Sequence, residues 1–492
     1  MNSLLTRLLF GIVLLPSGLT LPAGDFVLTI GGGYAAEGNQ ASLEKNVLLF
    51  QRTIQEIGLS PVRNDIYFAD GDDPAADLQV MDRSAVPEVN RLMAEFFGDD
   101  DDLGLSYRNH QIPNVRGAAT ATNVRRWFDT TGQSMKPGDR LIVYVTAHGN
   151  ESQRRGNEHD TTIAAWGTTF IRMTEFSDML DRLPQDIEVV LVMVQCYSGG
   201  FARLIFDQGD PERGLSRQRR VGVFATVHDR PAAGCTPDVD EANYAEYSTY
   251  FLAAVLGKDR TGNTIALPDH DGDGRISIAE AHAYTILSAD TIDLPVITSG
   301  EYLTVHSRFR EKGETNLLGD DESYETVLEL ASPSQRAVLE GLSEQLNLSG
   351  SDRLETAYQE SRPRRRRSSR RNDPASRLRR EIAKDLLNRW PPLANVLNPL
   401  SVSLLTDRQD EFLRVVRRHP DYGRYRKLAD DKQAEAGPRN KIVKYERLLR
   451  TADNVILAEN LRRLGDDEKW AEYQQLTADE SKNLGPRSST AN

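Results

Sequence analysis

Apolar runs of strand length alternate with helical periodicity between residues 25 and 228, and this alternation constrains the fold more than any other feature of the chain. We expect strands at residues 26–30, 65–69, 140–147, 187–194 and 221–227. We expect the main intervening helices at residues 42–58, 120–132 and 174–183. The strand segments are apolar almost throughout, which is typical of a parallel sheet with helices on both faces. The pattern therefore predicts an α/β fold, a three-layer αβα sandwich around a mostly parallel sheet.

The second half of the chain has a different character. After about residue 318 the apolar runs disappear and charged helical segments take their place. We therefore divide the chain into a leader (1–23), an α/β domain (24–317), a helical segment (318–361), an arginine-rich linker (362–380) and a charged helical C-terminal region (381–492). The linker carries ten arginines and one aspartate. Such a run is typical of a solvated connection, and it would also suit an anionic surface or a self-cleavage site.

The N-terminus predicts an exported protein. Arg7 is followed by an apolar segment that breaks at Pro16, which is too short for a stable membrane span, and a cleavage site fits near Ala23. We therefore expect a signal peptide and a periplasmic or extracellular location, with an uncleaved anchor or a buried first strand as the alternatives. The formal net charge of −13 argues against nucleic acid as the main partner, because phosphate binding requires clustered positive charge.

Two of the expected strands end in chemically reactive residues. One runs into His148-Gly149, and the next runs into Cys196 and a glycine-containing turn. The carboxyl ends of parallel strands meet at one edge of a sheet, so His148 and Cys196 are expected to lie side by side. A thiol beside an imidazole is the arrangement of a cysteine nucleophile and its base, and the amides of Gly149 and Cys196 are the expected donors to an oxyanion. Considered alone, Cys196 would more often be an inert core thiol, and His148 would more often be a structural or surface histidine.

This pattern resembles the caspase-like cysteine peptidases, in which a strand ending in His-Gly precedes a strand ending in Cys by about 50 residues; here the separation is 48. The run 196–199, Cys-Tyr-Ser-Gly, is most similar to the legumain-type and metacaspase-type branches, and residues 30–46 resemble the first strand and helix of bacterial legumain-like members. The resemblance covers about residues 25–300. It implies that residues 24–317 form a caspase-like endopeptidase domain with polypeptide substrates, a His148–Cys196 dyad and no obligatory third residue.

The residue that precedes the scissile bond (P1) is left open by this resemblance. In several branches a polar residue two positions before the cysteine helps to form the P1 pocket, whereas this chain has Val194 there and Gln195 next to the cysteine. Asn, Asp and Arg or Lys all remain possible at P1. Thr226 and Asp229, just past the next strand, are candidates for substrate binding, and Asp229 would favour a basic side chain.

Residues 269–280 match a twelve-residue calcium loop at every ligand position. The expected ligands, at positions 1, 3, 5, 7, 9 and 12, are Asp269, Asp271, Asp273, the carbonyl of Arg275, Ser277 and Glu280. Residues 258–268 do not resemble an entering helix, so we expect a loop–helix unit that holds a structural Ca²⁺. An acidic turn that caps the following helix is the alternative reading, and no organic cofactor is expected.

The second cysteine, Cys235, lies in a loop rich in proline and glycine. A disulfide with Cys196 would disable the nucleophile, so we expect Cys235 to be free or occasionally regulatory. The sequence as a whole predicts an exported, calcium-stabilised cysteine endopeptidase that is able to process itself. The rival hypotheses are a catalytically silent caspase-like protein that binds peptides, and a calcium-dependent scaffold whose helical tail is the working part.

Overall fold

The structure is a computed structural model that describes residues 23–362, 373–434 and 438–487. The predicted leader, except its last residue, and most of the arginine-rich linker lie outside these residues. Within the described part of the chain, no helix is both long enough and apolar enough to cross a membrane.

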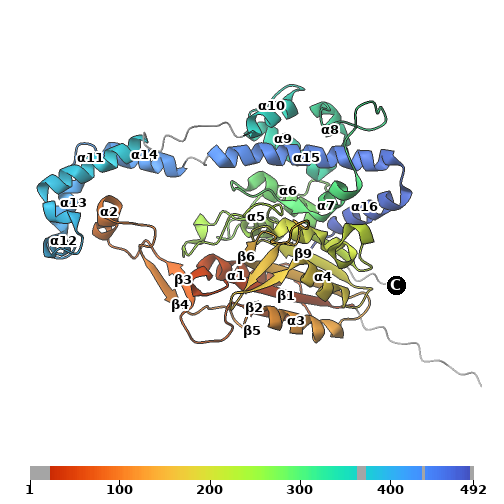
Figure 1. Cartoon of the computed structure of the whole chain (residues 1–492), viewed down its shortest axis with the longest axis horizontal. Coiled ribbons are helices and arrows are strands. Elements are labelled where there is room, and N and C mark those ends of the chain that lie inside the picture. The colour runs from red at the N-terminus through yellow and green to blue at the C-terminus, as the bar shows by residue number, and fades with distance from the viewer. Residues whose placement is uncertain (1–22, 363–372, 435–437, 488–492) are drawn as a thin grey trace, which may run out of the picture.

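A mostly parallel sheet forms the centre of the molecule (Figure 1). Its strands follow the order β11 (Val296–Ile297), β10 (Arg219–Phe224), β9 (Glu188–Met193), β6 (Arg140–Asn150), β1 (Asp25–Gly32), β2 (Arg63–Phe68) and β5 (Val115–Gly117). Neighbours from β10 to β5 are parallel, and β11 runs antiparallel at one edge. The end of β6 continues past the sheet and pairs with the hairpin of β7 (Thr162–Ala165) and β8 (Thr169–Arg172). The predicted α/β fold with a mostly parallel sheet is confirmed.

Helices cover both faces of this sheet, which gives the three layers. One face carries α3 (Ala121–Asp129) and α4 (Met173–Asp181), and the other carries α1 (Ala41–Glu56), α5 (Tyr247–Leu256), α6 (Ile278–Ser288) and α7 (Thr298–His306). Successive strand residues point to opposite faces, so Val143 packs with the first set and Ile142 with the second. This is why the strands are apolar at consecutive positions.

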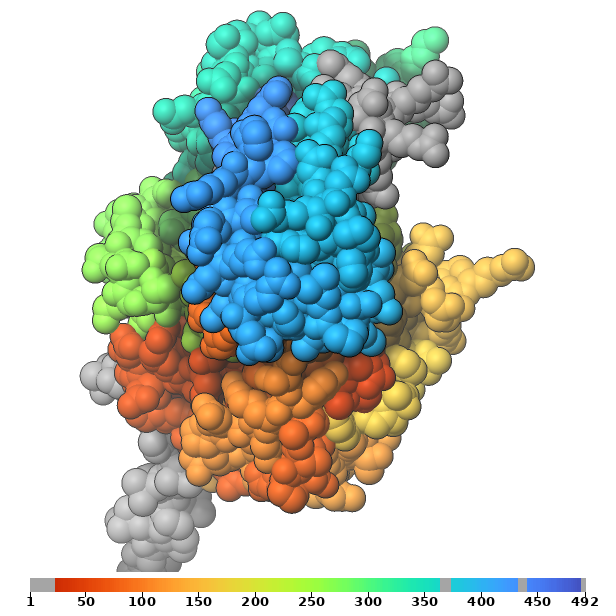
Figure 2. Space-filling model, turned by 90° about the vertical axis from the view of Figure 1, so that its left-hand side faces the viewer, coloured from red at the N-terminus to blue at the C-terminus, as the bar shows by residue number. Residues whose placement is uncertain are grey.

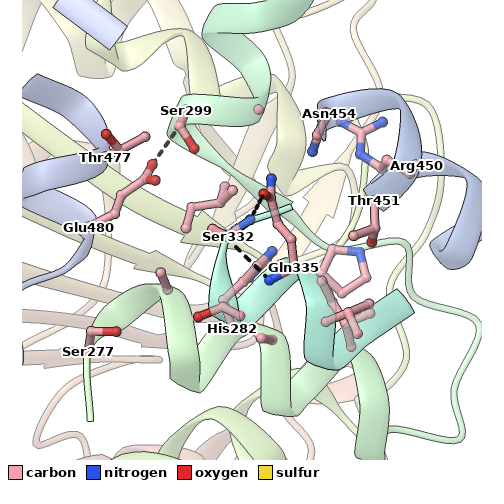
Figure 3. Close-up of a pocket in the computed structure, with 18 of the residues that line it drawn as sticks. Ser277, His282, Ser299, Ser332, Gln335, Arg450, Thr451, Asn454, Thr477 and Glu480 are labelled. Atoms are coloured by element: carbon pink, nitrogen blue, oxygen red, sulfur yellow. Dashed lines mark hydrogen bonds between the residues drawn. The ribbon is translucent and has the colours of Figure 1, made fainter. Parts of the chain in front are cut away.

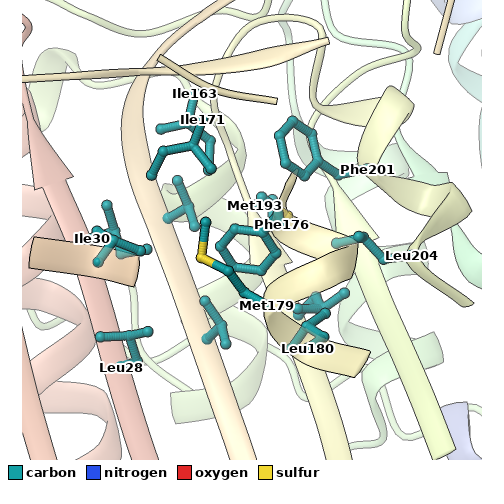
Figure 4. Close-up of a cluster of buried hydrophobic side chains, with 14 of the residues drawn as sticks. Leu28, Ile30, Ile163, Ile171, Phe176, Met179, Leu180, Met193, Phe201 and Leu204 are labelled. Carbon is teal, nitrogen blue, oxygen red and sulfur yellow. The ribbon is translucent and has the colours of Figure 1, made fainter. Parts of the chain in front are cut away.

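The core on the α4 side also holds the turn that follows Cys196. Figure 4 shows Phe201 and Leu204 from this turn beside Phe176 and Leu180 of α4. All four side chains are completely buried. Tightly packed apolar side chains of α4 therefore hold the turn that follows Cys196 in place.

A second group of elements lies beside the start of α1, where Gln40 forms a β-bridge with Gln79. The strands β3 (Leu78–Met81) and β4 (Leu105–Arg108) form an antiparallel pair, with α2 (Glu88–Phe97) between them in the chain. Four helices from the C-terminal region pack on α2: α11 (Pro374–Arg389), α12 (Pro399–Leu405), α13 (Gln409–Arg417) and α14 (Tyr422–Ala434). Figure 2 shows this helical group seated on the segment that contains α2, β3 and β4.

The remaining helices cover the α5–α7 side of the molecule. They are α8 (Tyr324–Leu330), α9 (Pro333–Gln345), α10 (Arg353–Ser361), the long α15 (Pro438–Leu464) and α16 (Asp467–Glu480). Leu457 and Leu461 of α15 and Leu476 of α16 belong to the same buried cluster as α1, α5 and the sheet. The C-terminal helices therefore complete the core of the α/β domain.

The last described residues form hydrogen bonds with residues at the starts of β1 and β6. Arg140, at the start of β6, is 4% exposed and donates a hydrogen bond to the carbonyl of Gly485 at 2.9 Å. Arg487 donates to the carbonyls of Gly24 at 2.9 Å and Gly138 at 2.5 Å. The end of the described chain thus contacts the amino ends of β1 and β6, more than 340 residues away in the sequence.

Candidate active site

His148 and Cys196 come from neighbouring parallel strands at the same level of the sheet. Val145 of β6 pairs in register with Met193 of β9. His148 and Cys196 each follow three residues after this pair, at the carboxyl ends of the strands. The expected juxtaposition of the two strand ends is therefore present.

Gly149 lies directly against the backbone of Cys196. A Cβ atom at position 149 would stand 2.1 Å from the carbonyl oxygen of Cys196 and 2.8 Å from Cγ of Gln195. Contacts of this length do not occur between real side chains, so glycine is required here by close approach of the two chains. The glycine that follows the histidine thus allows the two strand ends to touch.

The imidazole of His148 is oriented by two oxygen atoms. Its Nε2 lies 2.8 Å from the carbonyl oxygen of Gly38 and 3.0 Å from Oε1 of Gln40. Both partners are acceptors, so Nε2 carries the proton and Nδ1 keeps its lone pair. Tyr34 packs edge-on against the ring, with the ring centroids 5.5 Å apart. Burial lowers the pKa of His148, and the Gly38 carbonyl opposes this effect.

The thiol of Cys196 is covered by Ala232. The amide nitrogen of Ala232 lies 3.3 Å from Sγ, and Sγ lies 3.8 Å from the carbonyl oxygen of the same residue. Burial raises the pKa of Cys196, so the thiol stays protonated at neutral pH. Among the hydrogen bonds of the described residues, none joins Cys196 to His148. The resting site is therefore a neutral thiol and a neutral imidazole.

The segment 230–239 holds Ala232 in place, and we call it the covering segment. At one end, Arg230 makes two hydrogen bonds, of 2.5 and 2.9 Å, to the carboxylate of Glu446 on α15. In the middle, the amide of Ala233 donates to Asp293 at 2.5 Å. Further along, the amide of Thr236 donates to Oγ of Ser42 at 2.9 Å. The cover over the thiol thus depends on α15 as well as on the α/β domain.

One titratable group contacts the covering segment, and a second belongs to it. Asp293 is completely enclosed, and burial raises its pKa to about 7. Cys235 is a free thiol whose pKa burial raises strongly, with a further contribution from Cys196. Cys235 also has a positive φ of 57°, a conformation that residues with a side chain rarely adopt. The prediction that Cys235 is free agrees with this arrangement.

The predicted substrate-binding residues occupy different environments. Thr226 is completely buried, and its hydroxyl accepts a hydrogen bond from the amide of Leu294 at 3.4 Å. Asp229 is exposed. Gln195 is 1% exposed, and within the described structure neither atom of its amide group has a hydrogen-bond partner. Contacts of Thr226 and Asp229 with substrate stay predictions.

The structure brings three of the predicted calcium ligands together. Carboxylate oxygens of Asp269, Asp271 and Asp273 lie within 4.8 Å of one another. Gly274 takes the positive φ of 80° that the sharp turn at position 6 requires. Glu280 is outside this group: its carboxylate accepts from the amides of His270 and Asp271 and from Ser277, which it joins in a capping box at the start of α6. The ligand roles of Glu280, Arg275 and Ser277 stay predictions.

Comparison with known proteins gives a distant relationship. No family model matches the chain. Metacaspase-6 of Arabidopsis thaliana is 24% identical over 151 residues, and Metacaspase-4 of the same plant is 25% identical over 107 residues. The chain resembles metacaspases. The two alignments cover 29% and 21% of this chain and 39% and 25% of the relatives, so the chain spans less than half the length of the curated proteins it matches.

These matches support the caspase-like superfamily, and they do not confirm the expected closeness to legumain-type members. A solved structure of a Geobacter sulfurreducens protein covers 56% of this chain and 92% of its own length, with a TM-score of 0.33 and 11% identity. This similarity is too weak to support an argument about function.

The sequence did not reveal the groups that contact His148 and Cys196. The Gly38 carbonyl that holds His148 and the Ala232 amide that meets Cys196 are backbone groups. Backbone groups occur at every residue, so no side-chain pattern marks them. Gln195 was visible as a polar residue at the end of an apolar run, and its unpaired amide is the kind of feature that is found at functional sites.

Proposed function

We propose that this protein is a cysteine endopeptidase in which Cys196 is the nucleophile and His148 is the base. The observation that carries the proposal is the meeting of the two residues at adjacent parallel strand ends, with Gly149 packed against the Cys196 backbone. The low-identity matches to metacaspases agree with this chemistry.

The orientation of His148 suits the proposed reaction. Nδ1 is free to accept the proton of the Cys196 thiol, and the resulting thiolate attacks the peptide carbonyl carbon. The imidazolium then protonates the leaving amine, which breaks the C–N bond and leaves a thioester on Cys196. Water, deprotonated by His148, attacks the thioester and releases the acid. The carbonyl of Gly38 steadies the imidazolium, because it accepts the Nε2 proton throughout the cycle.

The resting arrangement requires one change before catalysis. Ala232 lies against Sγ of the partly exposed Cys196, and the raised pKa of Cys196 and lowered pKa of His148 disfavour the ion pair. A shift of the covering segment would release Sγ from the Ala232 backbone and open more of the thiol to a substrate. The neutral thiol and neutral imidazole also suit the rival function, a catalytically silent protein that binds peptides through the same cleft.

A peptide-library assay separates these functions. The full chain is tested on peptides with Arg, Lys, Asn or Asp at P1, with and without Ca²⁺, beside the variants Cys196→Ala and His148→Ala. We expect turnover that both variants lose. No turnover under any condition, including after proteolytic trimming of the C-terminal tail, would refute the peptidase proposal and leave the binding function.

Export and self-processing form part of the proposal. N-terminal sequencing of the secreted protein is expected to find a start near residue 24, and sequencing of fragments is expected to find cleavage within residues 362–380. The Cys196→Ala variant is expected to lack the second cleavage and to keep the first. Cleavage of the linker in this variant would show that another protease is responsible.

We also propose that residues 269–280 bind a structural Ca²⁺. The three converging carboxylates and the positive φ of Gly274 support this assignment. Extracellular calcium sites have dissociation constants of about 10⁻⁴–10⁻³ M, so 1 mM Ca²⁺ is expected to stabilise the fold by about 0.4–1.4 kcal/mol.

Thermal unfolding with Ca²⁺ and with a chelator tests the site. We expect Ca²⁺ to raise the melting temperature of the wild type and Asp273→Ala to remove the rise. The matched control is Asp100→Ala, because Asp99, Asp100 and Asp101 form the other close acidic group of the described residues and are exposed. If Asp100→Ala removed the Ca²⁺-induced rise in melting temperature and Asp273→Ala kept it, the calcium site would lie at residues 99–101 and not at residues 269–280.

A further inference from the structure

A cavity of about 230 Å³ lies where the C-terminal helices meet the α/β domain (Figure 3). Its walls come from α6 and α7 of the α/β domain, from α9, and from α15 and α16. Among the described residues, its lining includes neither His148 nor Cys196 and no part of the covering segment. The cavity is therefore separate from the candidate active site.

Much of the cavity wall is apolar. Ala283, Leu294, Leu303 and Val338 line it, and all four side chains are buried. An apolar cavity of about 150 Å³ is large enough to hold benzene. The volume here therefore accommodates one ring with a short substituent, and the apolar wall favours a ligand with an apolar body.

Two polar side chains on the wall keep free hydrogen-bonding capacity. His282 of α6 is 5% exposed, and its Nδ1 lies 2.8 Å from the hydroxyl oxygen of Tyr247. Among the hydrogen bonds of the described residues, none engages Nε2 of His282 or the side-chain amide of Asn454 on α15. Both side chains line the cavity. A ligand with one polar group therefore supplies the partner that the buried Nε2 lacks.

The charged groups of the wall already have partners. Oε1 of Glu480 accepts two hydrogen bonds of 2.7 Å each, and the guanidinium group of Arg447 donates to four backbone carbonyls. Arg450 is only partly buried, and it has the carboxylates of Glu301 and Asp453 as charge partners. Figure 3 shows Glu480 and Arg450 on opposite walls. A cation in the cavity would meet the arginines and an anion would meet Glu480, so a neutral ligand fits best.

We propose that this cavity binds a small neutral alcohol, whose apolar body is the size of one ring and whose hydroxyl group bonds to Nε2 of His282. A hydroxyl group both donates and accepts, so it matches Nε2 in either tautomer of the histidine. The bound molecule would contact α6 and α7 together with α15, and it would stabilise the packing of the C-terminal helices on the α/β domain. The proposal does not depend on peptidase activity, because it concerns binding alone.

Binding of benzyl alcohol to the full chain tests this site. Saturation-transfer NMR at neutral pH gives the dissociation constant, and benzylamine and benzoate serve as charged analogues with the same ring. We expect saturable binding of benzyl alcohol with a dissociation constant of about 1 mM or lower. Both analogues are expected to bind at least about tenfold more weakly, because the burial of a charge is costly. Tighter binding of either analogue would overturn the assignment to a neutral ligand.

Two variants locate the site. His282→Phe keeps a ring of similar size and removes Nε2, and it is expected to weaken the binding of benzyl alcohol at least about tenfold. His306→Phe is the matched control, because Nε2 of His306 is also buried without a partner in the described structure, whereas His306 does not line the cavity. If His282→Phe does not fold, Ala279→Leu replaces it; Ala279 is a half-buried residue of the wall, and the larger side chain is expected to exclude the ligand. Absence of saturable binding by the wild type, or unchanged binding by the variant of the cavity wall, would overturn the proposal.

Discussion

Replacement of Gly149 by alanine tests the geometry on which the site is built. The added Cβ would stand 2.1 Å from the Cys196 carbonyl oxygen, whereas real Cβ contacts are longer than 3.0 Å. The backbones of Gly149 and Cys196 must therefore separate by about 0.9 Å, and the nearest atoms are backbone atoms that cannot rotate away. Overpacking of this kind costs about 1–3 kcal/mol of folding free energy. A displacement of about 1 Å at a reacting group costs roughly 100-fold in rate.

The assay combines urea unfolding with kcat/KM on the best peptide found in the library. Gly117→Ala is the control, because the nearest atom to a Cβ at that strand position is 3.8 Å away. We expect Gly149→Ala to lose stability and about 100-fold in kcat/KM, and Gly117→Ala to lose little of either. If Gly149→Ala matched the control in both measurements, the contact between the two strand ends would not exist as described.

Two further predictions concern charge. Burial raises the pKa of Glu480 to about 7 from a usual value near 4.5. The folded state therefore holds this proton more tightly than the unfolded state, and the stability that the proton contributes at pH 4.5 is lost as the pH rises through 7. In urea unfolding, Glu480→Gln is expected to be more stable than the wild type by on the order of 1–3 kcal/mol at pH 8, and no more stable at pH 4.5. Equal pH profiles would contradict the burial of an ionisable carboxyl group. Glu446→Gln breaks the pair that anchors Arg230, and it is expected to speed alkylation of Cys196 by iodoacetamide several-fold, read by mass spectrometry of the Cys196 peptide. Glu459→Gln, which breaks a pair on the exposed side of α15, is the control and is expected to alkylate at the wild-type rate.

The sheet and the placement of His148 and Cys196 at neighbouring strand ends were predictable because their signals are local. The apolar runs around Val143 and Val190 are buried on consecutive positions, and this pattern alone indicates strands covered on both faces. The residues His148 and Cys196 stand at the ends of such runs, so the parallel arrangement brings them together. A short local pattern was sufficient in both cases.

The cover over the thiol was not predictable, because its contacts join distant segments. Arg230 pairs with Glu446 across 216 residues, and the Gly38 carbonyl meets His148 across 110 residues. Charged residues such as Glu446 are common on helices, and nothing local distinguishes one that reaches an active site.

The contact between the chain end and the start of β6 affects the timing of folding during synthesis. Besides its ion pair with Asp25, the guanidinium group of Arg140 donates to the carbonyl of Gly485, 345 residues later. At a synthesis rate of about 5–20 residues per second, that interval lasts roughly 20–70 s. During it, α1, α5, α6 and α7 can already cover this face of the sheet, but the buried cluster still lacks Leu461 and Leu476. A growing chain of this protein therefore completes this hydrophobic core only when its last helices emerge, and a stop codon before α15 would leave the core incomplete.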